Sequence, residues 1–269
     1  MPSPAADAPF PERAFNVTAL KWNTCAWLLL PVLVFMAWMH WYVSIPLAAL
    51  MAAGLAPGRR KELPERESLP SFPLFNRSSF LVLGAFIALM VLSGWGEWVN
   101  QHPDHIVRNA CLRELVASPW PVVFPDGDVL IYNTGFWLVP ALAGKVAGLE
   151  VARAFVVLWG AWGLFLAWLW LCVFSGRRSL LLALLMVMFG SLLNFQCWLG
   201  LDLFRLHYFG TAEQVMCSAN ASIPVMLFFI FLASGRMPPH WMPLLFAATA
   251  FYSPLAALGG LPLAVCQWL

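Results

Sequence analysis

The chain carries little charge for its length. Only 10% of its 269 residues are Asp, Glu, Lys or Arg, and the formal net charge is +2. A soluble protein of this size needs far more polar side chains to cover its surface, so the composition argues against a soluble globular domain. There is also no basic tract with interleaved aromatic residues. We therefore predict that nucleic acid is not a partner.

Cysteine motifs are missing as well. The six cysteines are scattered, without CxxC or CxxH spacing, and most lie in or beside apolar segments, where Cys behaves as a small hydrophobic residue. We predict neither a disulfide nor a cysteine-bound metal; if one disulfide forms, Cys111 and Cys217 are the candidates. Residues 1–21 lack the apolar core and cleavage site of a secretory signal, so the first apolar segment is expected to be retained.

Apolar residues are abundant instead. They make up 61% of the chain, with 21 Phe and 15 Trp, and apolar stretches near the length that crosses a bilayer recur throughout. This pattern predicts an all-α integral membrane protein, a polytopic helical bundle of about 6–8 membrane helices surrounded by membrane lipids. We expect a flexible N-terminal tail at 1–22 and a single transmembrane helical domain at 23–269.

The distribution of basic residues predicts the topology. The linker 56–78 holds five basic residues, which places it in the cytoplasm. The segment 94–131 holds two basic and five acidic residues and is expected to be an outer loop, with a second outer loop at 199–221. The apolar stretch 25–55 is either one long tilted span or a hairpin turning near His40, and the hairpin is favoured. Segment 131–149 fits a helix at the interface better than a crossing.

The final apolar piece, 259–269, has no polar tail to anchor it at an interface. We therefore expect the chain to be a fragment of a longer protein.

The first outer loop contains the densest group of polar residues. Its segment 100–122 reads NQHPDHIVRNACLRELVASPWPV. Pro103 suits the first turn of a helix, and prolines at 119 and 121 would end it, which predicts an amphipathic interfacial helix over 103–117. Steps of 100° place one set of residues on a polar arc: Asp104, His105, Arg108, Asn109 and Arg113. The opposite arc holds Ile106, Val107, Ala110 and Cys111.

Two interpretations of this helix remain open. In the first, it is a solvated face on which Asp104 and Arg108 form an ion pair one turn apart. In the second, Asp104 acts as a general base or metal ligand while Arg108 holds an anionic group. His102 and His105 flank Asp104 and are weak candidates to bind a divalent cation, the only cofactor that the residues suggest.

Other polar residues lie in nearly apolar surroundings. The second loop contributes Arg205, His207 and Glu213 as candidate substrate-binding residues, with structural capping as the alternative. Glu97 is expected to be an interfacial carboxylate, and Lys145 and Arg153 are expected to meet lipid headgroups.

Four stretches together suggest a family. The first, DHIVRNACLRELVASPWPV (104–122), resembles a bacterial pattern of the form D-[WY]-x-K-H-N-A-x-L-x-D-L-x-x-x-x-W-P-V. The segments YNTGFWLVPALAGKVAG (132–148), CSANASIPVMLFF (217–229) and FYSPLAALGGLPLA (251–264) resemble later parts of the same proteins, in the same order. These are large polytopic proteins that look like GT-C glycosyltransferases.

The resemblance implies a function. Enzymes of this type take a polyprenyl-phosphate-linked sugar and transfer the sugar on the outer face of the membrane, here the bacterial inner (plasma) membrane. It makes Asp104 the candidate catalytic residue and Asn109 a match to the family Asn, with Asn109 and Arg108 as substrate-binding residues. The chain departs from the pattern at His105, Val107, Arg108 and Glu114, so Arg108 would have to replace the family Lys at the phosphate.

Two other functions compete with this one. A transporter or flippase would place ionisable residues near the middle of the bilayer, whereas here they lie at loop positions and the spans are almost free of charge. That distribution favours chemistry at the membrane surface. A non-catalytic membrane protein whose loops bind a partner is the third possibility.

Overall fold

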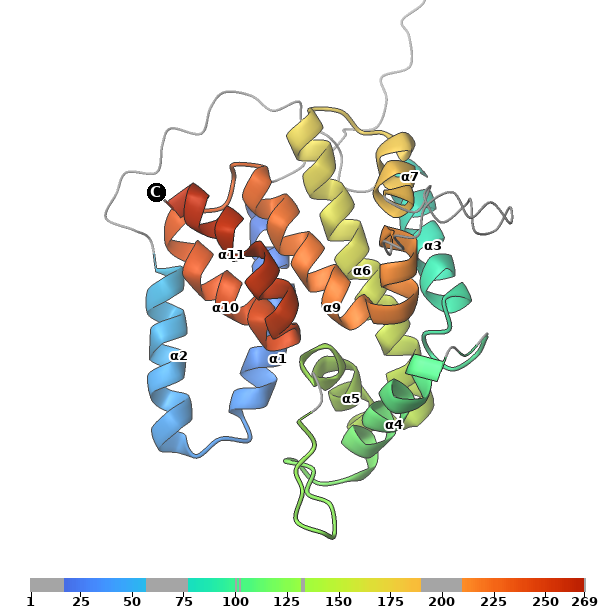
Figure 1. The fold of residues 1–269 in the computed structure, drawn as a ribbon, viewed down its shortest axis with the longest axis vertical. Helices are drawn as coiled ribbons and strands as arrows, with labels where there is room; N and C mark the ends of the chain where they lie inside the picture. Colours follow the sequence, from blue (N-terminus) through green and yellow to red (C-terminus); the bar gives the residue numbers. More distant parts are fainter. Residues whose placement is uncertain are drawn as a thin grey trace, which may run out of the picture.

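Figure 1 shows the computed structural model, which describes residues 17–56, 77–99, 101, 103–131, 134–189 and 210–268. Within these ranges every regular element is a helix, apart from an isolated bridge between Val123 and Val129. This confirms the all-α prediction. The elements are α1 (Val17–Met36), α2 (Trp41–Leu55), α3 (Arg77–Leu92), α4 (Pro103–Ala117), α5 (Gly135–Ala147), α6 (Leu149–Ser175), α7 (Leu180–Met188), α9 (Thr211–Ala233), the 3-10 turn η1 (Pro239–Trp241), α10 (Met242–Tyr252) and α11 (Pro254–Trp268).

Three of these helices are long and apolar enough to cross a membrane. They are α1, α6 and α9, with 20, 27 and 23 residues. The helices α2, α3 and α5 are apolar but have only 15, 16 and 13 residues, which at 1.5 Å per residue is less than the hydrocarbon thickness. The described residues thus support a helical membrane protein with three candidate spans.

The stretch predicted as a hairpin is two helices. The first ends at Met36 and the second begins at Trp41, after a turn that includes His40. The hairpin that the sequence favoured is therefore present. Its first helix begins at Val17, inside the range expected to be a flexible tail.

Helix α6 packs against α3, α5 and α9, and most of its middle is buried. Its glycines let the neighbours come close. A Cβ on Gly160 would lie 2.3 Å from Met90 of α3, and one on Gly163 would lie 2.6 Å from Ile223 of α9 and 2.7 Å from Trp27 of α1. Small residues allow such close approach between membrane helices, where dispersion contacts replace a hydrophobic driving force.

Helices α3 and α6 run antiparallel. At one end Arg178 donates a hydrogen bond to Ser79 Oγ at 3.1 Å, and at the other Arg153 forms an ion pair with Glu97. Helices α4 and α5 lie at the Glu97 end, opposite the turn between α6 and α7 (Figure 1). Arg153, expected to meet lipid headgroups, and Glu97, expected to be an interfacial carboxylate, thus bind each other.

The helix expected at the interface is α5, a short helix whose Phe136 and Trp137 side chains are buried between neighbouring helices. One segment differs from its prediction. In the segment 199–221, residues 211–221 are not a loop but the start of α9, and residues 199–209 lie outside the described residues. The helix begins there because Glu213 Oε2 accepts a hydrogen bond from the Gly210 N–H at 2.9 Å, which caps its first turn.

Candidate functional site

Helix α4 has the predicted bounds, Pro103–Ala117. Pro103 takes the first position, where a missing N–H costs nothing, and Asp104 follows in the first turn, where the helix dipole favours an acidic group. At the other end Lys145 of α5 donates to the Ser118 carbonyl at 2.6 Å and lies 5.0 Å from the ring centroid of Trp120. Lys145, which was expected to meet lipid headgroups, therefore holds the end of α4.

On α4, some polar side chains are buried and some apolar ones are exposed, which is the reverse of the pattern on a solvated helix. His105 is fully buried and Arg108 is only 5% exposed, together with Cys111, Leu112 and Leu115. Ile106 and Val107 face outward and are 69% and 53% exposed. The prediction of a polar arc in water was thus wrong for His105 and Arg108. In a membrane protein the surroundings are partly lipid, so apolar side chains can face outward while polar ones gather inside.

The guanidinium of Arg108 lies among three groups. Its Cζ is 5.7 Å from the ring centroid of Trp95, and Nη2 donates to Ser218 Oγ at 3.4 Å. The same nitrogen is 3.8 Å from Asp104 Oδ2, so the predicted ion pair is present. Within the part of the chain that the structure describes, Nε and Nη1 are buried and have no hydrogen-bond partner. A buried cation with donors to spare is able to bind an anion.

Trp95 is the residue that joins these elements, and sequence reasoning missed it. Its Nε1–H donates to the Val215 carbonyl of α9 at 2.9 Å. Its ring meets His105 edge to face at 5.2 Å between centroids and stacks on Trp137 at 5.4 Å. In this segment the sequence drew attention only to Glu97, because no local pattern shows which cation a Trp ring will meet.

Helix α9 is interrupted at Ser218, the residue that Arg108 contacts. Ser218 has φ −151° and ψ 41°, which are not helical values. Beside the break the Gln214 carbonyl accepts a hydrogen bond from Ser222 Oγ, eight residues further along the chain, at 3.3 Å. The next carbonyl, that of Val215, is the acceptor for Trp95. Broken helices are tolerated at membrane depth where the irregular backbone is enclosed by protein or lines a cavity, and they often form binding sites there.

Two acidic residues lie near this break. Asp104, Arg108 and Glu213 are close enough to Cys217 for their charges to act on its thiol. The Asp104 side chain is 51% exposed, so its carboxylate can be reached from outside while Arg108 remains covered. The structure thus brings together a reachable carboxylate and a buried guanidinium at the start of a candidate span.

Other predicted site residues have structural contacts. Asn109 Nδ2 donates to Gln101 Oε1 at 2.7 Å, so this side chain holds the preceding turn and does not point to the Arg108 site. Glu213 caps α9 through the Gly210 N–H, which is the structural alternative that the sequence had left open. Both residues therefore act on the positions of helices.

The metal prediction finds no support in the described residues. No group of three or more His, Cys, Asp or Glu side chains there could hold a metal ion. His105 lies buried beside Trp95, and His102 lies outside the described residues, as do Arg205 and His207 of the second loop.

Five cysteines lie among the described residues, and all are free thiols: Cys25, Cys111, Cys172, Cys217 and Cys266. Burial raises the pKa of the Cys111 thiol to about 12, so it stays protonated and unreactive at neutral pH. The pair named in the sequence, Cys111 and Cys217, is not bonded.

Comparison with known proteins gives no relative: no family model, no curated protein and no solved structure matches the chain.

Proposed function

We propose that this protein is a membrane glycosyltransferase of the GT-C type, which transfers a sugar from a polyprenyl-phosphate donor on the outer face of the bacterial plasma membrane. The observation that carries the proposal is the state of Arg108. Arg108 is 5% exposed, and two of its guanidinium nitrogens have no hydrogen-bond partner among the described residues. A phosphate group that accepts from these nitrogens would supply both the missing hydrogen bonds and a compensating charge.

In the proposed reaction the two ends of the ion pair have different roles. The exposed carboxylate of Asp104 takes the proton from the acceptor hydroxyl as its oxygen forms a bond to the anomeric carbon of the sugar. The bond between that carbon and the phosphate oxygen breaks, and the lipid phosphate leaves with the bonding electrons. Arg108 stabilises the charge that develops on this phosphate, and its burial strengthens the effect because water does not screen it.

The outer face of α4 fits an amphiphilic substrate. Ile106 and Val107 are exposed beside the inward-facing Arg108, so the helix offers an apolar surface to lipid and a cation to the interior. A donor whose tail stays in the bilayer would reach Arg108 with its phosphate at the level of the headgroups. We also propose that the protein is a multi-pass membrane protein with a bundle of about 6–8 membrane helices.

A second candidate is a transporter or flippase for a lipid-linked or small polar solute. The break in α9 favours it, because discontinuous helices commonly form the substrate sites of transporters. The two functions differ in whether a covalent bond changes.

Transfer of radiolabel tests the proposal. Membranes containing the whole chain are incubated with radiolabelled polyprenyl-phosphate sugars, and wild type is compared with Asp104→Asn and Arg108→Gln. Loss of the base should lower the rate about 10²–10⁴-fold. Loss of the guanidinium should lower it about 10²–10³-fold.

Asp128→Asn is the matched control, since this exposed carboxylate lies in the loop that follows α4, where Asp128 forms hydrogen bonds through its backbone N–H and carbonyl. It should transfer sugar at the wild-type rate. Transfer that survives Asp104→Asn would remove Asp104 from the mechanism. Movement of the lipid or solute across proteoliposomes without any transfer would support the transporter instead.

A further inference from the structure

The turn that follows α3 has an unusual backbone. Gly94 and Gly96 have φ of 92° and 89°, and Glu97, which is not a glycine, has φ of 66°. A side chain with a Cβ rarely adopts this left-handed conformation, so the surrounding contacts must hold it there. The result is that the Glu97 side chain turns inward and is only 9% exposed.

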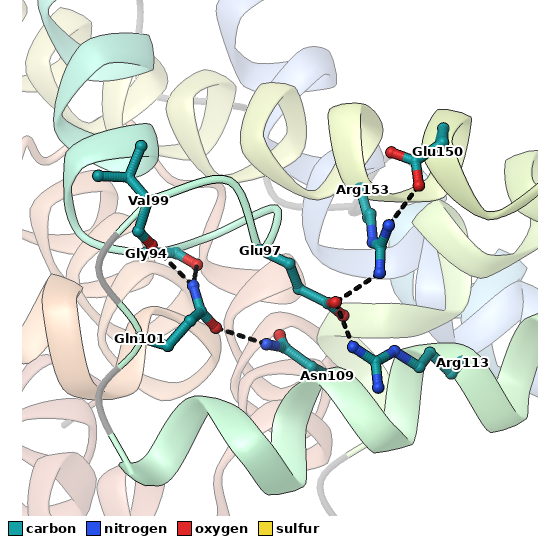
Figure 2. A network of polar contacts seen from close by, with 8 residues as sticks. All are labelled: Gly94, Glu97, Val99, Gln101, Asn109, Arg113, Glu150 and Arg153. Carbon is teal, nitrogen blue, oxygen red and sulfur yellow. Dashed lines mark hydrogen bonds and ion pairs between the residues drawn. The ribbon is translucent and has the colours of Figure 1, made fainter.

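The Glu97 carboxylate joins two helices (Figure 2). Its Oε2 accepts from Arg113 of α4 and from Arg153 of α6, and Arg153 also binds Glu150. The four charges balance, so removal of the Glu97 charge leaves Arg113 without an acidic partner in this network and Arg153 with Glu150 alone. The network links the turn, α4 and α6 at the end of the molecule that contains the Arg108 site.

The same turn holds α4 at a second point. Gln101 Nε2 donates to the carbonyls of Gly94 and Val99 at 2.9 and 2.7 Å, and its Oε1 accepts from Asn109 of α4 (Figure 2). Asn109 is four residues before Arg113, so both lie on one edge of the helix, one turn apart. Two contacts on one edge fix the rotation of a helix about its own axis as well as its position.

That rotation decides where Arg108 points. At 100° per residue, the edge that carries Asn109 and Arg113 lies about 100° to 140° around the helix from Arg108. If the contacts of Asn109 and Arg113 were lost and α4 rotated, the Arg108 guanidinium would move away from Ser218. It now contacts Ser218, the residue at the break in α9, at 3.4 Å.

We propose that Glu97 is a positioning residue: through Arg113 it sets the rotation of α4 and so holds Arg108 at the break in α9. The inference rests on the proposed function, because its first test measures sugar transfer. Its second test measures thiol labelling and does not depend on any activity. Glu97 itself does not touch Arg108 and has no part in the chemistry.

The activity experiment is a double-mutant cycle with Glu97→Gln, Arg113→Gln and both together. Because Arg108 binds the donor phosphate and stabilises it as it leaves, misplacing it should lower kcat between about tenfold and a hundredfold per folded molecule and also raise KM for a polyprenyl-phosphate sugar. The double variant should be no slower than Glu97→Gln, because both substitutions break one contact. Effects that multiply would overturn the proposal, as would wild-type kcat in Glu97→Gln.

Glu150→Gln is the matched control. It removes a carboxylate from the same network, but Glu150 contacts Arg153 and no residue of α4. Its kcat should equal that of wild type. Arg113→Gln keeps the pair between Glu97 and Arg153 and is the variant to rely on where Glu97→Gln does not fold.

The second measurement uses Cys217, which lies next to the break and near the charge of Arg108. In a background with Cys111→Ala, Cys197→Ser and Cys266→Ser, the rate of labelling by N-ethylmaleimide should rise at least about threefold in Glu97→Gln and in Arg113→Gln, because a loosened α4 makes the Cys217 thiol more accessible. Glu150→Gln should label like wild type. Unchanged labelling in the first two variants contradicts the proposal. Faster labelling in a protein that transfers no sugar would support the role of Glu97 while refuting the proposed transferase.

Discussion

Replacement of Arg108 by Met should leave the fold as stable as before or slightly more stable, while it removes function. Methionine fills a similar volume without a charge. Residues that exist for binding often cost stability, because they hold polar groups ready for a ligand that is not always there. A structural arginine would behave in the opposite way.

The contacts of Arg108 give the magnitude. Nε and Nη1 are buried donors without partners among the described residues, and each such donor costs about 1–3 kcal/mol. Against this, the Trp95 contact contributes about 1–2 kcal/mol. The long hydrogen bond to Ser218 contributes about 1 kcal/mol, and the half-exposed Asp104 no more than about 1 kcal/mol. At the midpoints of these ranges the cost is about 4 kcal/mol and the gain about 3 kcal/mol, so Arg108→Met should change the free energy of unfolding by between 0 and about +2 kcal/mol.

Thermal unfolding in detergent, followed by tryptophan fluorescence, measures the effect. At this chain length a change of 1 kcal/mol shifts Tm by about 2–4 °C, so Arg108→Met should unfold at the wild-type temperature or a few degrees above it. Polyprenyl phosphate should raise the Tm of wild type and not that of the variant, since a ligand stabilises only the form that binds it.

Arg153→Met is the contrasting variant. Arg153 is engaged by Glu97 and Glu150, and its loss leaves the mostly buried Glu97 carboxylate with Arg113 alone. It should lower the stability by about 2–4 kcal/mol. If Arg108→Met lowers Tm as much as Arg153→Met does, then Arg108 is a structural residue and the reasoning fails.

Two further predictions concern packing and topology. Gly163→Ala should lower Tm, since the added Cβ would lie 2.6 Å from a neighbouring helix and overpacking costs about 1–3 kcal/mol. Gly84→Ala should leave Tm unchanged, because open space surrounds Gly84. Equal Tm values for the two variants would contradict the packing of α6. A cysteine placed at the exposed Ala117 should react with an impermeant maleimide on intact cells. A cysteine placed at the exposed Arg177 should react only after the cells are permeabilised. The reverse result would put Asp104 in the cytoplasm and refute the proposed topology.

Much of the local structure around the site could be predicted. The bounds of α4 followed from Pro103, the apolar and polar arcs and the prolines beyond Ala117. The ion pair between Asp104 and Arg108 followed from helical spacing alone. Such features depend on neighbours within one or two turns, which the sequence lists directly.

The direction in which α4 faces could not be predicted in the same way. The pattern of the helix is compatible with polar residues in water or with polar residues turned inside, and the choice depends on what surrounds the helix. The fold decides it through Glu97 and Gln101, which hold one edge of α4, and through Trp95, which faces Arg108. Those partners are between 8 and 16 residues away in the chain, beyond the range of helical periodicity.

By itself, then, the sequence determined that this is a helical membrane protein and that 103–117 forms a helix with a charged pair, because composition and periodicity act over short distances. Only the tertiary structure decided that Arg108 is buried against a break at Ser218 and that Glu97 joins α4 to α6. The physical reason is that burial and ion pairing depend on which distant segments meet. In lipid, moreover, an exposed apolar face costs nothing, so polarity alone does not tell which side of a helix points inward.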